Sequence, residues 1–133
     1  MARVEISPYA TVYRIGGSPL KNAEPHVGHE LLLKFDIRHF FDRITYALVR
    51  TYAFPSDVFS DSNSTLLTTL CCFRDCLPQG ALSSPAISNI IMWDFDNAVG
   101  IWCVKRNITY TRYRDDLTFS GVFDPSSVMI NEI

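Results

Sequence analysis

Three aspartates lie in segments whose other residues make a carboxylate unusual. Asp36 interrupts the apolar run Leu31–Ile37, and Asp115 and Asp116 are adjacent within a segment rich in β-branched and aromatic residues. Neighbouring carboxylates resist joint ionisation unless a cation compensates them, so a divalent metal with oxygen ligands is the economical explanation. Two such ions about 4 Å apart would serve an in-line phosphoryl transfer. From spacing alone, a plain polar turn at Asp115 and Asp116 explains the pair equally well.

The segments that must position these carboxylates are predicted to be strands. In residues 31–37, alternation places Lys34 and Asp36 on one face and four apolar side chains on the other: Leu31, Leu33, Phe35 and Ile37. Residues 108–120 favour a hairpin that turns near Asp115 and Asp116. We therefore expect Asp36 to point away from the core, on a strand adjacent to the hairpin.

Helices are predicted between the two strand regions. Residues 38 to about 53 carry apolar side chains at helical spacing, a second helix is expected over residues 64–73, and Ser83 with Pro85 marks the start of a long helix to about Lys105. Residues 1–29 are expected to form turns and loops, with at most a short strand over residues 11–15. The pattern predicts an α+β fold, a small antiparallel sheet with helices on one face.

Composition limits the classes of function. The chain has 133 residues and a net charge of −2, from 12 Lys plus Arg against 14 Asp plus Glu, which argues mildly against a nucleic-acid binder. A metal site would concentrate carboxylates, which weakens that argument. No apolar run approaches the roughly 20 residues that span a bilayer, and the N-terminus is unlike a secretory signal. We expect a cytoplasmic protein without membrane partners.

The four cysteines are expected to be buried, reduced thiols. They lack the paired Cys-x-x-Cys spacing of a zinc site and lie among apolar residues: Cys71, Cys72, Cys76 and Cys103.

Several motifs resemble those of one family. Residues 113–116, Tyr-Arg-Asp-Asp, resemble the Tyr-x-Asp-Asp box of reverse transcriptases. Residues 77–89 begin Leu-Pro-Gln-Gly and resemble the family's nucleotide-pocket motif and the helix after it, while residues 35–41 resemble its strand with the first catalytic aspartate. Upstream, Ser18, Asn22-Ala23 and His26 are similar to the Asn-Ala-x-x-His stretch of retron-type enzymes. Over roughly residues 15–121, the chain resembles bacterial reverse transcriptases of the retron and group II intron type.

The resemblance implies the palm of a right-hand polymerase. Residues 1–29 would be a partial fingers or entry segment, and residues 30–133 a partial palm without its C-terminal strand and thumb. The activity implied is RNA-directed DNA synthesis by two-metal phosphoryl transfer. Asp36, Asp115, Asp116 and the backbone carbonyl of Ile37 would hold two Mg²⁺ ions, with Mn²⁺ as a substitute. The implied partners are an RNA template, a DNA or RNA primer, deoxynucleoside triphosphates and a cognate structured non-coding RNA.

The same resemblance assigns residues to the incoming nucleotide. Phe41 would act as a steric gate against a ribose 2′-hydroxyl, although it is otherwise a plain core phenylalanine beside Phe40. Gln79 and Gly80 would line the nucleotide. Arg38 would meet the triphosphate, and a solvated arginine at a helix start is an equal alternative.

Some residues depart from the family pattern. Arg114 replaces a small or apolar residue, Leu82 a common proline, and Asp42-Arg43 a shorter polar pair. Arg114 would either pair with the aspartates and compete with metal, or turn to the other strand face and meet a primer phosphate. Strand alternation favours the second arrangement.

The residues are also compatible with other functions. Because the chain stops at Ile133, it is expected to be inactive alone. The alternatives are an antiviral or untemplated polymerase with the same palm, and a non-catalytic remnant or RNA-binding piece of a defence-related reverse transcriptase. The type of reverse transcriptase and the template are left open.

Overall fold

The computed structural model describes residues 5–124, whose contacts group into two compact units. One unit comprises residues 38–93 with residues 5–6, and the other residues 7–37 with residues 94–124. The elements in chain order are α1 (Pro19–Ala23), η1 (Glu24–His26), β1 (Leu31–Asp36), α2 (Phe40–Arg43), α3 (Tyr46–Leu48), η2 (Val49–Ala53), α4 (Asp61–Cys71), α5 (Ser84–Ile91), α6 (Trp93–Val104), β2 (Thr109–Tyr113) and β3 (Asp116–Gly121).

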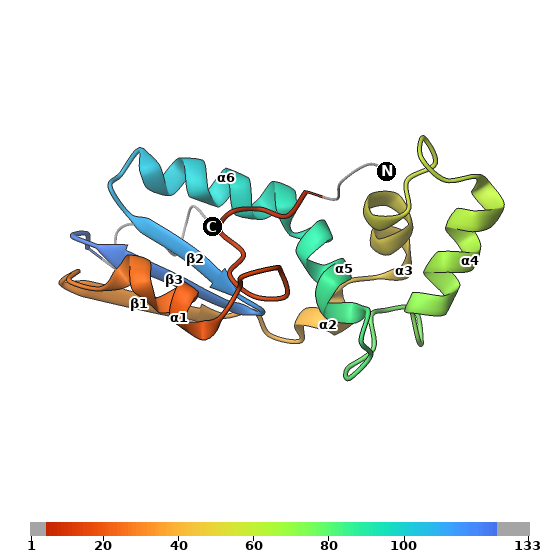
Figure 1. Ribbon diagram of the computed structural model, residues 1–133, viewed down its shortest axis with the longest axis horizontal. Coiled ribbons are helices and arrows are strands. Elements are labelled where there is room, and N and C mark those ends of the chain that lie inside the picture. Colours follow the sequence, from red (N-terminus) through yellow and green to blue (C-terminus); the bar gives the residue numbers. More distant parts are fainter. Residues whose placement is uncertain (1–4, 125–133) are drawn as a thin grey trace. The chain divides into compact units, whose positions relative to one another are not determined.

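The second unit is built on a three-stranded antiparallel sheet in the order β1-β3-β2 (Figure 1). β2 and β3 form the predicted hairpin, and β1 pairs along the other side of β3. In this register Asp36 is opposite Asp116, and Asp116 is also opposite Tyr113. The expected α+β class with a small antiparallel sheet is confirmed.

One face of the sheet packs against α6. Phe119 is completely buried and stacks on Tyr110, while Val99 and Cys103 of α6 lie in the same core cluster. Burial raises the pKa of the Cys103 thiol to about 11, as expected of an inert packed cysteine. The other three cysteines are half-buried and free, so the expected burial holds fully only for Cys103.

The opposite face of the sheet is polar. Strand alternation places Asp36, Thr118 and Ser120 on this face, away from Phe119. η1 contacts it through His26, whose ring nitrogens hydrogen-bond to the hydroxyls of Ser120 and Thr111. The expectation of helices on one face alone is therefore wrong: α6 packs against the apolar face, and the α1–η1 segment contacts the polar face.

β1 shows the predicted alternation with reduced burial. Leu33 and Ile37 pack against the core, and Phe35 contacts Phe119 edge-on. Leu31 and Phe35 remain more than a third exposed because β1 is at the sheet edge. Residues 11–15 were expected to form at most a short strand, and they form bends and a turn, next to an isolated bridge from Ala10 to Arg112. The loops expected over the rest of residues 1–29 are wrong in one place, because residues 19–26 form the short helices α1 and η1.

The first unit replaces the predicted helix over residues 38–53 with α2, α3 and the π-helix η2. The helix stops because Ile44 is extended and accepts a hydrogen bond from the Leu77 amide, while Thr45 bridges to Cys76. The Thr45 hydroxyl then caps α3.

The remaining helices are close to expectation. α4 begins three residues earlier than predicted, because the Ser60 hydroxyl accepts from the Asn63 amide and caps it. The long helix from residue 84 is divided into α5 and α6 by a turn at Met92. None of the helices in the described part of the chain has the length and apolar character that crossing a membrane requires.

The buried imidazole of His26 makes stability depend on pH. Burial, reinforced by the nearby His29, lowers the pKa of His26 from 6.5, so the unfolded chain binds the proton more readily than the folded one. The free energy of unfolding should therefore fall as the pH drops below about 6.5. Urea denaturation at several pH values between about 5.5 and 7.5 measures this dependence.

In that series, His26→Gln should flatten the pH dependence and His39→Gln, at an exposed position, should preserve it. Equal pH dependence in the chain and in His26→Gln would contradict the assignment.

Candidate metal centre

Three carboxylates converge where β1 meets the hairpin. One oxygen from each of Asp36, Asp115 and Asp116 lies within 4.8 Å of the others. The strand register brings Asp36 opposite Asp116. The turn is tied to β1 by the Ile37 amide, which donates to the Asp115 carbonyl at 2.9 Å. The structure thus brings together the three aspartates singled out by sequence.

The electrostatics of this cluster are unfavourable in the absence of a cation. Burial raises the pKa of Asp115, and the charges of Asp36 and Asp116 raise it further. Among residues 5–124, no lysine or arginine forms an ion pair with any of the three. The cluster therefore has negative charge in excess.

The donor set fits a hard divalent cation. Three carboxylate oxygens at this spacing are ligands that Mg²⁺ and Mn²⁺ accept, and Asp36 is exposed, so the cluster is open to solvent. Ile37 packs its side chain on the core, and its carbonyl as a further ligand stays a prediction.

Arg114 occupies the first position of the two-residue turn with φ of 58°. Its guanidinium lies over the rings of Tyr13 and Tyr113, with centroid distances of 5.4 and 5.5 Å. It forms no ion pair with Asp115 or Asp116. Of the two arrangements expected for Arg114, the ion pair with the aspartates is not found, and a contact with a primer phosphate stays a prediction.

The predicted nucleotide residues belong to the other unit, so their relation to the carboxylates stays a prediction. Phe41 is half-buried and stacks on the buried Phe40 at 5.6 Å. Arg38 and Gln79 are exposed. Gly80 has φ of 81° and open space around its α-carbon, so glycine is required there by backbone conformation rather than by close packing.

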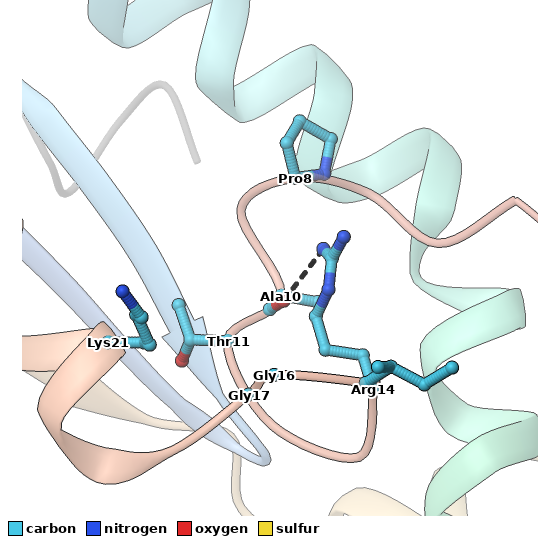
Figure 2. A pocket seen from close by; sticks show the side chains of 8 residues that line it. Pro8, Ala10, Thr11, Arg14, Gly16, Gly17 and Lys21 are labelled. Carbon is cyan, nitrogen blue, oxygen red and sulfur yellow. Dashed lines mark hydrogen bonds between the residues drawn. The ribbon is translucent and has the colours of Figure 1, made fainter.

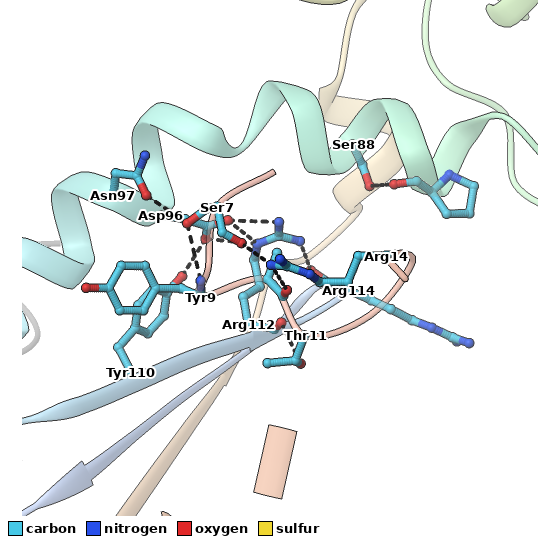
Figure 3. Close-up of polar contacts among 12 residues, drawn as sticks. Ser7, Tyr9, Thr11, Arg14, Ser88, Asp96, Asn97, Tyr110, Arg112 and Arg114 are labelled. Atoms are coloured by element: carbon cyan, nitrogen blue, oxygen red, sulfur yellow. Dashed lines mark hydrogen bonds and ion pairs between the residues drawn. The ribbon is translucent and has the colours of Figure 1, made fainter. Parts of the chain in front are cut away.

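Sequence reasoning missed a buried ion pair behind the turn. Arg112 and Asp96 are both fully buried, and the Arg112 guanidinium donates to both Asp96 oxygens at 2.9–3.1 Å (Figure 3). The Tyr110 hydroxyl donates to the same carboxylate at 2.8 Å, and burial raises its pKa strongly. Alternation places Arg112 on the core face with Tyr110, and an arginine at a core position was the available signal.

A pocket of about 250 Å³ lies in the second unit, and it contains none of the carboxylate cluster (Figure 2). Its charged lining residues are both cations. Arg14 donates to the carbonyls of Ser7 and Ala10, and Lys21 pairs with Glu24. The two Arg14 hydrogen bonds close the loop over residues 7–14 on itself, which indicates a structural role for Arg14.

Comparison with known proteins gives a consistent set of relatives. The chain is 36% identical to the retron Ec86 reverse transcriptase of Escherichia coli over 119 residues, which cover 90% of this chain and 37% of that protein. It is 40% identical to the retron Ec83 reverse transcriptase of Escherichia coli, covering 84% of this chain and 38% of that protein. It is 32% identical to the retron Mx65 reverse transcriptase of Myxococcus xanthus, covering 91% of this chain and 32% of that protein.

These matches cover between 32% and 38% of the relatives' own length. No protein-family model matches the chain.

The excess negative charge of the cluster should lower the stability of the metal-free chain and favour the binding of a metal ion. Asp115→Asn should raise the melting temperature without divalent ions, because it removes a partly buried charge and its repulsion from the other two carboxylates. A gain of about 1 kcal/mol in the free energy of unfolding corresponds to a few degrees. Mg²⁺ should raise the melting temperature of the unaltered chain and have less effect on the variant.

Thermal denaturation with and without Mg²⁺ measures both effects, and Asp57→Asn, at an exposed site outside the cluster, serves as the control. A variant that is less stable than the chain without metal, or equally stabilised by Mg²⁺, would argue against a strained metal centre.

Proposed function

This chain belongs with the retron reverse transcriptases over the segment that it shares with them, and we propose that it forms the palm of an RNA-directed DNA polymerase. The activity proposed is addition of deoxynucleotides to a primer 3′-hydroxyl on an RNA template. A cognate structured RNA is the proposed source of that template. Residues 1–29 would contribute part of the fingers and residues 30–133 part of the palm.

The observation that carries the proposal is the convergence of Asp36, Asp115 and Asp116 within 4.8 Å. The carboxylates come from two paired strands and the turn between β2 and β3, so rigid elements position them. Chains related by sequence are named as reverse transcriptases, and phosphoryl transfer is the chemistry that such an oxygen cluster supports.

Each carboxylate has a role in this proposal. Asp36, Asp115 and Asp116 would hold the two metal ions, and the Ile37 carbonyl would be a further ligand. Bound Mg²⁺ would supply activation of the primer hydroxyl and neutralisation of charge on the phosphates. The protein's own contribution is to hold the reacting groups in line.

The nucleotide would be selected by residues of the first unit. Phe41 is proposed as the gate against the ribose 2′-hydroxyl, Gln79 and Gly80 as the lining of the nucleotide, and Arg38 as a contact for the triphosphate. A flat and rigid aromatic side chain rejects an additional oxygen by steric overlap.

Primer extension should require more protein than this chain. It matches little more than a third of its relatives' length, and its 12 Lys plus Arg against 14 Asp plus Glu offer few phosphate contacts. We expect little or no synthesis by the 133-residue chain with Mg²⁺ and a primed RNA template, and synthesis once it is joined to the thumb of a related reverse transcriptase. Gel analysis of extension products measures this.

Asp116→Asn in the joined protein is the control and should abolish synthesis. Strong synthesis by the chain alone would refute the need for further segments. RNA binding without synthesis by any joined form would instead favour the non-catalytic, RNA-binding alternative.

Replacement of the gate residue should relax sugar selection. In the joined protein, Phe41→Val should raise the use of ribonucleotides relative to deoxynucleotides by about tenfold or more, because it removes the overlap with the 2′-hydroxyl. Phe40→Val is a matched control at the neighbouring, buried position: it should lower stability and leave selectivity unchanged. Unaltered selectivity in Phe41→Val would identify Phe41 as core packing.

A further inference from the structure

A buried cation connects the core helix α6 to the turn that carries the carboxylates. The Nη1 atom of Arg112 donates to the backbone carbonyl of Arg114 at 2.8 Å. The rest of the same guanidinium binds Asp96 of α6 through Nε and Nη2 (Figure 3). A single planar group therefore reaches both the helix and the turn.

The backbone around Arg112 is fixed on both sides. Its amide donates to the Tyr9 carbonyl at 2.8 Å, and its carbonyl accepts from the Thr11 amide at 3.0 Å. On the other side, Arg112 is paired with Leu117 of β3. Because the backbone and the guanidinium of Arg112 are both held, its Nη1 donor to the Arg114 carbonyl has a defined position.

The turn that receives this hydrogen bond has an unfavourable backbone conformation. Arg114 is left-handed with φ of 58°, at the first position of a two-residue hairpin loop where glycine is usual. A non-glycine residue there is strained and persists only when its surroundings hold it. A charge-assisted hydrogen bond to its carbonyl stabilises that conformation.

The next carbonyl of the turn is held as well. That of Asp115 accepts from the Ile37 amide at 2.9 Å, which joins the turn to the end of β1. Two successive carbonyls are thus bound by two fixed donors, Arg112 behind the turn and Ile37 beside it. The side chains of Asp115 and Asp116 leave this turn toward Asp36.

We propose that Arg112, held by Asp96, is a positioning residue: its hydrogen bond to the Arg114 carbonyl fixes the strained turn so that Asp115 and Asp116 meet Asp36. The effect of Arg112 on metal binding rests on the proposed function. Its effect on the conformation of the turn does not, and it is testable without metal. A displacement of the carboxylates by a fraction of an ångström would weaken a shared coordination sphere.

The test compares Arg112→Lys with Tyr110→Phe in the 133-residue chain. Lysine keeps a cation near Asp96 and lacks the fork that also reaches the Arg114 carbonyl. Tyr110→Phe removes another hydrogen bond to Asp96 and leaves the Arg112 bond to the turn in place. The readouts are amide hydrogen exchange at Ile37, followed by NMR in the absence of metal, and Mn²⁺ affinity, followed by paramagnetic relaxation.

In Arg112→Lys, exchange at Ile37 should accelerate about tenfold or more, the effect of losing one charge-assisted hydrogen bond, and Mn²⁺ should bind correspondingly more weakly. The Phe119 amide in the middle of β3 should keep its protection. Tyr110→Phe should change neither readout, even where it lowers the melting temperature. Unchanged exchange at Ile37 in Arg112→Lys, or an equal change in Tyr110→Phe, would overturn the proposal.

The unaltered chain provides a test that needs no variant to fold. There the Ile37 amide should be nearly as protected as that of Phe119, and exchange at the rate of an exposed loop would overturn the proposal. Failure of the unaltered chain to bind Mn²⁺ would refute the proposed function instead, whereas the exchange of Ile37 would still decide the role of Arg112.

Discussion

The pairing of β3 with both of its neighbours determines to which face of the sheet each strand side chain points. A slip of one residue in the β1–β3 register would turn Asp36 toward α6 and Phe35 toward the polar face. The core prevents this, because Phe119 is fully buried and contacts Phe35. The position of the carboxylates therefore depends on apolar packing on the opposite face of the same strands.

The second unit contains two groups of charged side chains, of which one is compensated by its own members and the other is not. Asp96 and Arg112 are fully buried and satisfy each other, with Tyr110 as a further donor. Removing one partner of such a pair typically costs about 3–5 kcal/mol, because the other charge is left buried. Asp36, Asp115 and Asp116 lie together without a cation from the described residues. The compensated pair lies behind the turn, and the uncompensated cluster lies on its accessible side, where a ligand can supply the missing charge.

Sequence patterns predicted the elements that depend on local alternation and turn chemistry. A two-residue period predicted the strand at residues 31–36, the hairpin and the polar position of Asp36. Breaks in the helices were missed at Ile44 and Met92. At Ile44 the cause is a hydrogen bond from Leu77, more than thirty residues away, which no local pattern contains. The partnership of Asp96 with Arg112 was missed for the same reason.

Among the described residues, β1 pairs with β3 alone, so its outer edge presents backbone donors and acceptors. Leu31, Leu32 and Phe35 on this strand are all more than a third exposed. A strand with an open edge and apolar side chains is a template for addition of another strand, and Lys34 places a charge within it that opposes such pairing. At the concentrations used for purification and spectroscopy, this edge would make solubility sensitive to salt, because screening weakens the repulsion between lysines of neighbouring molecules.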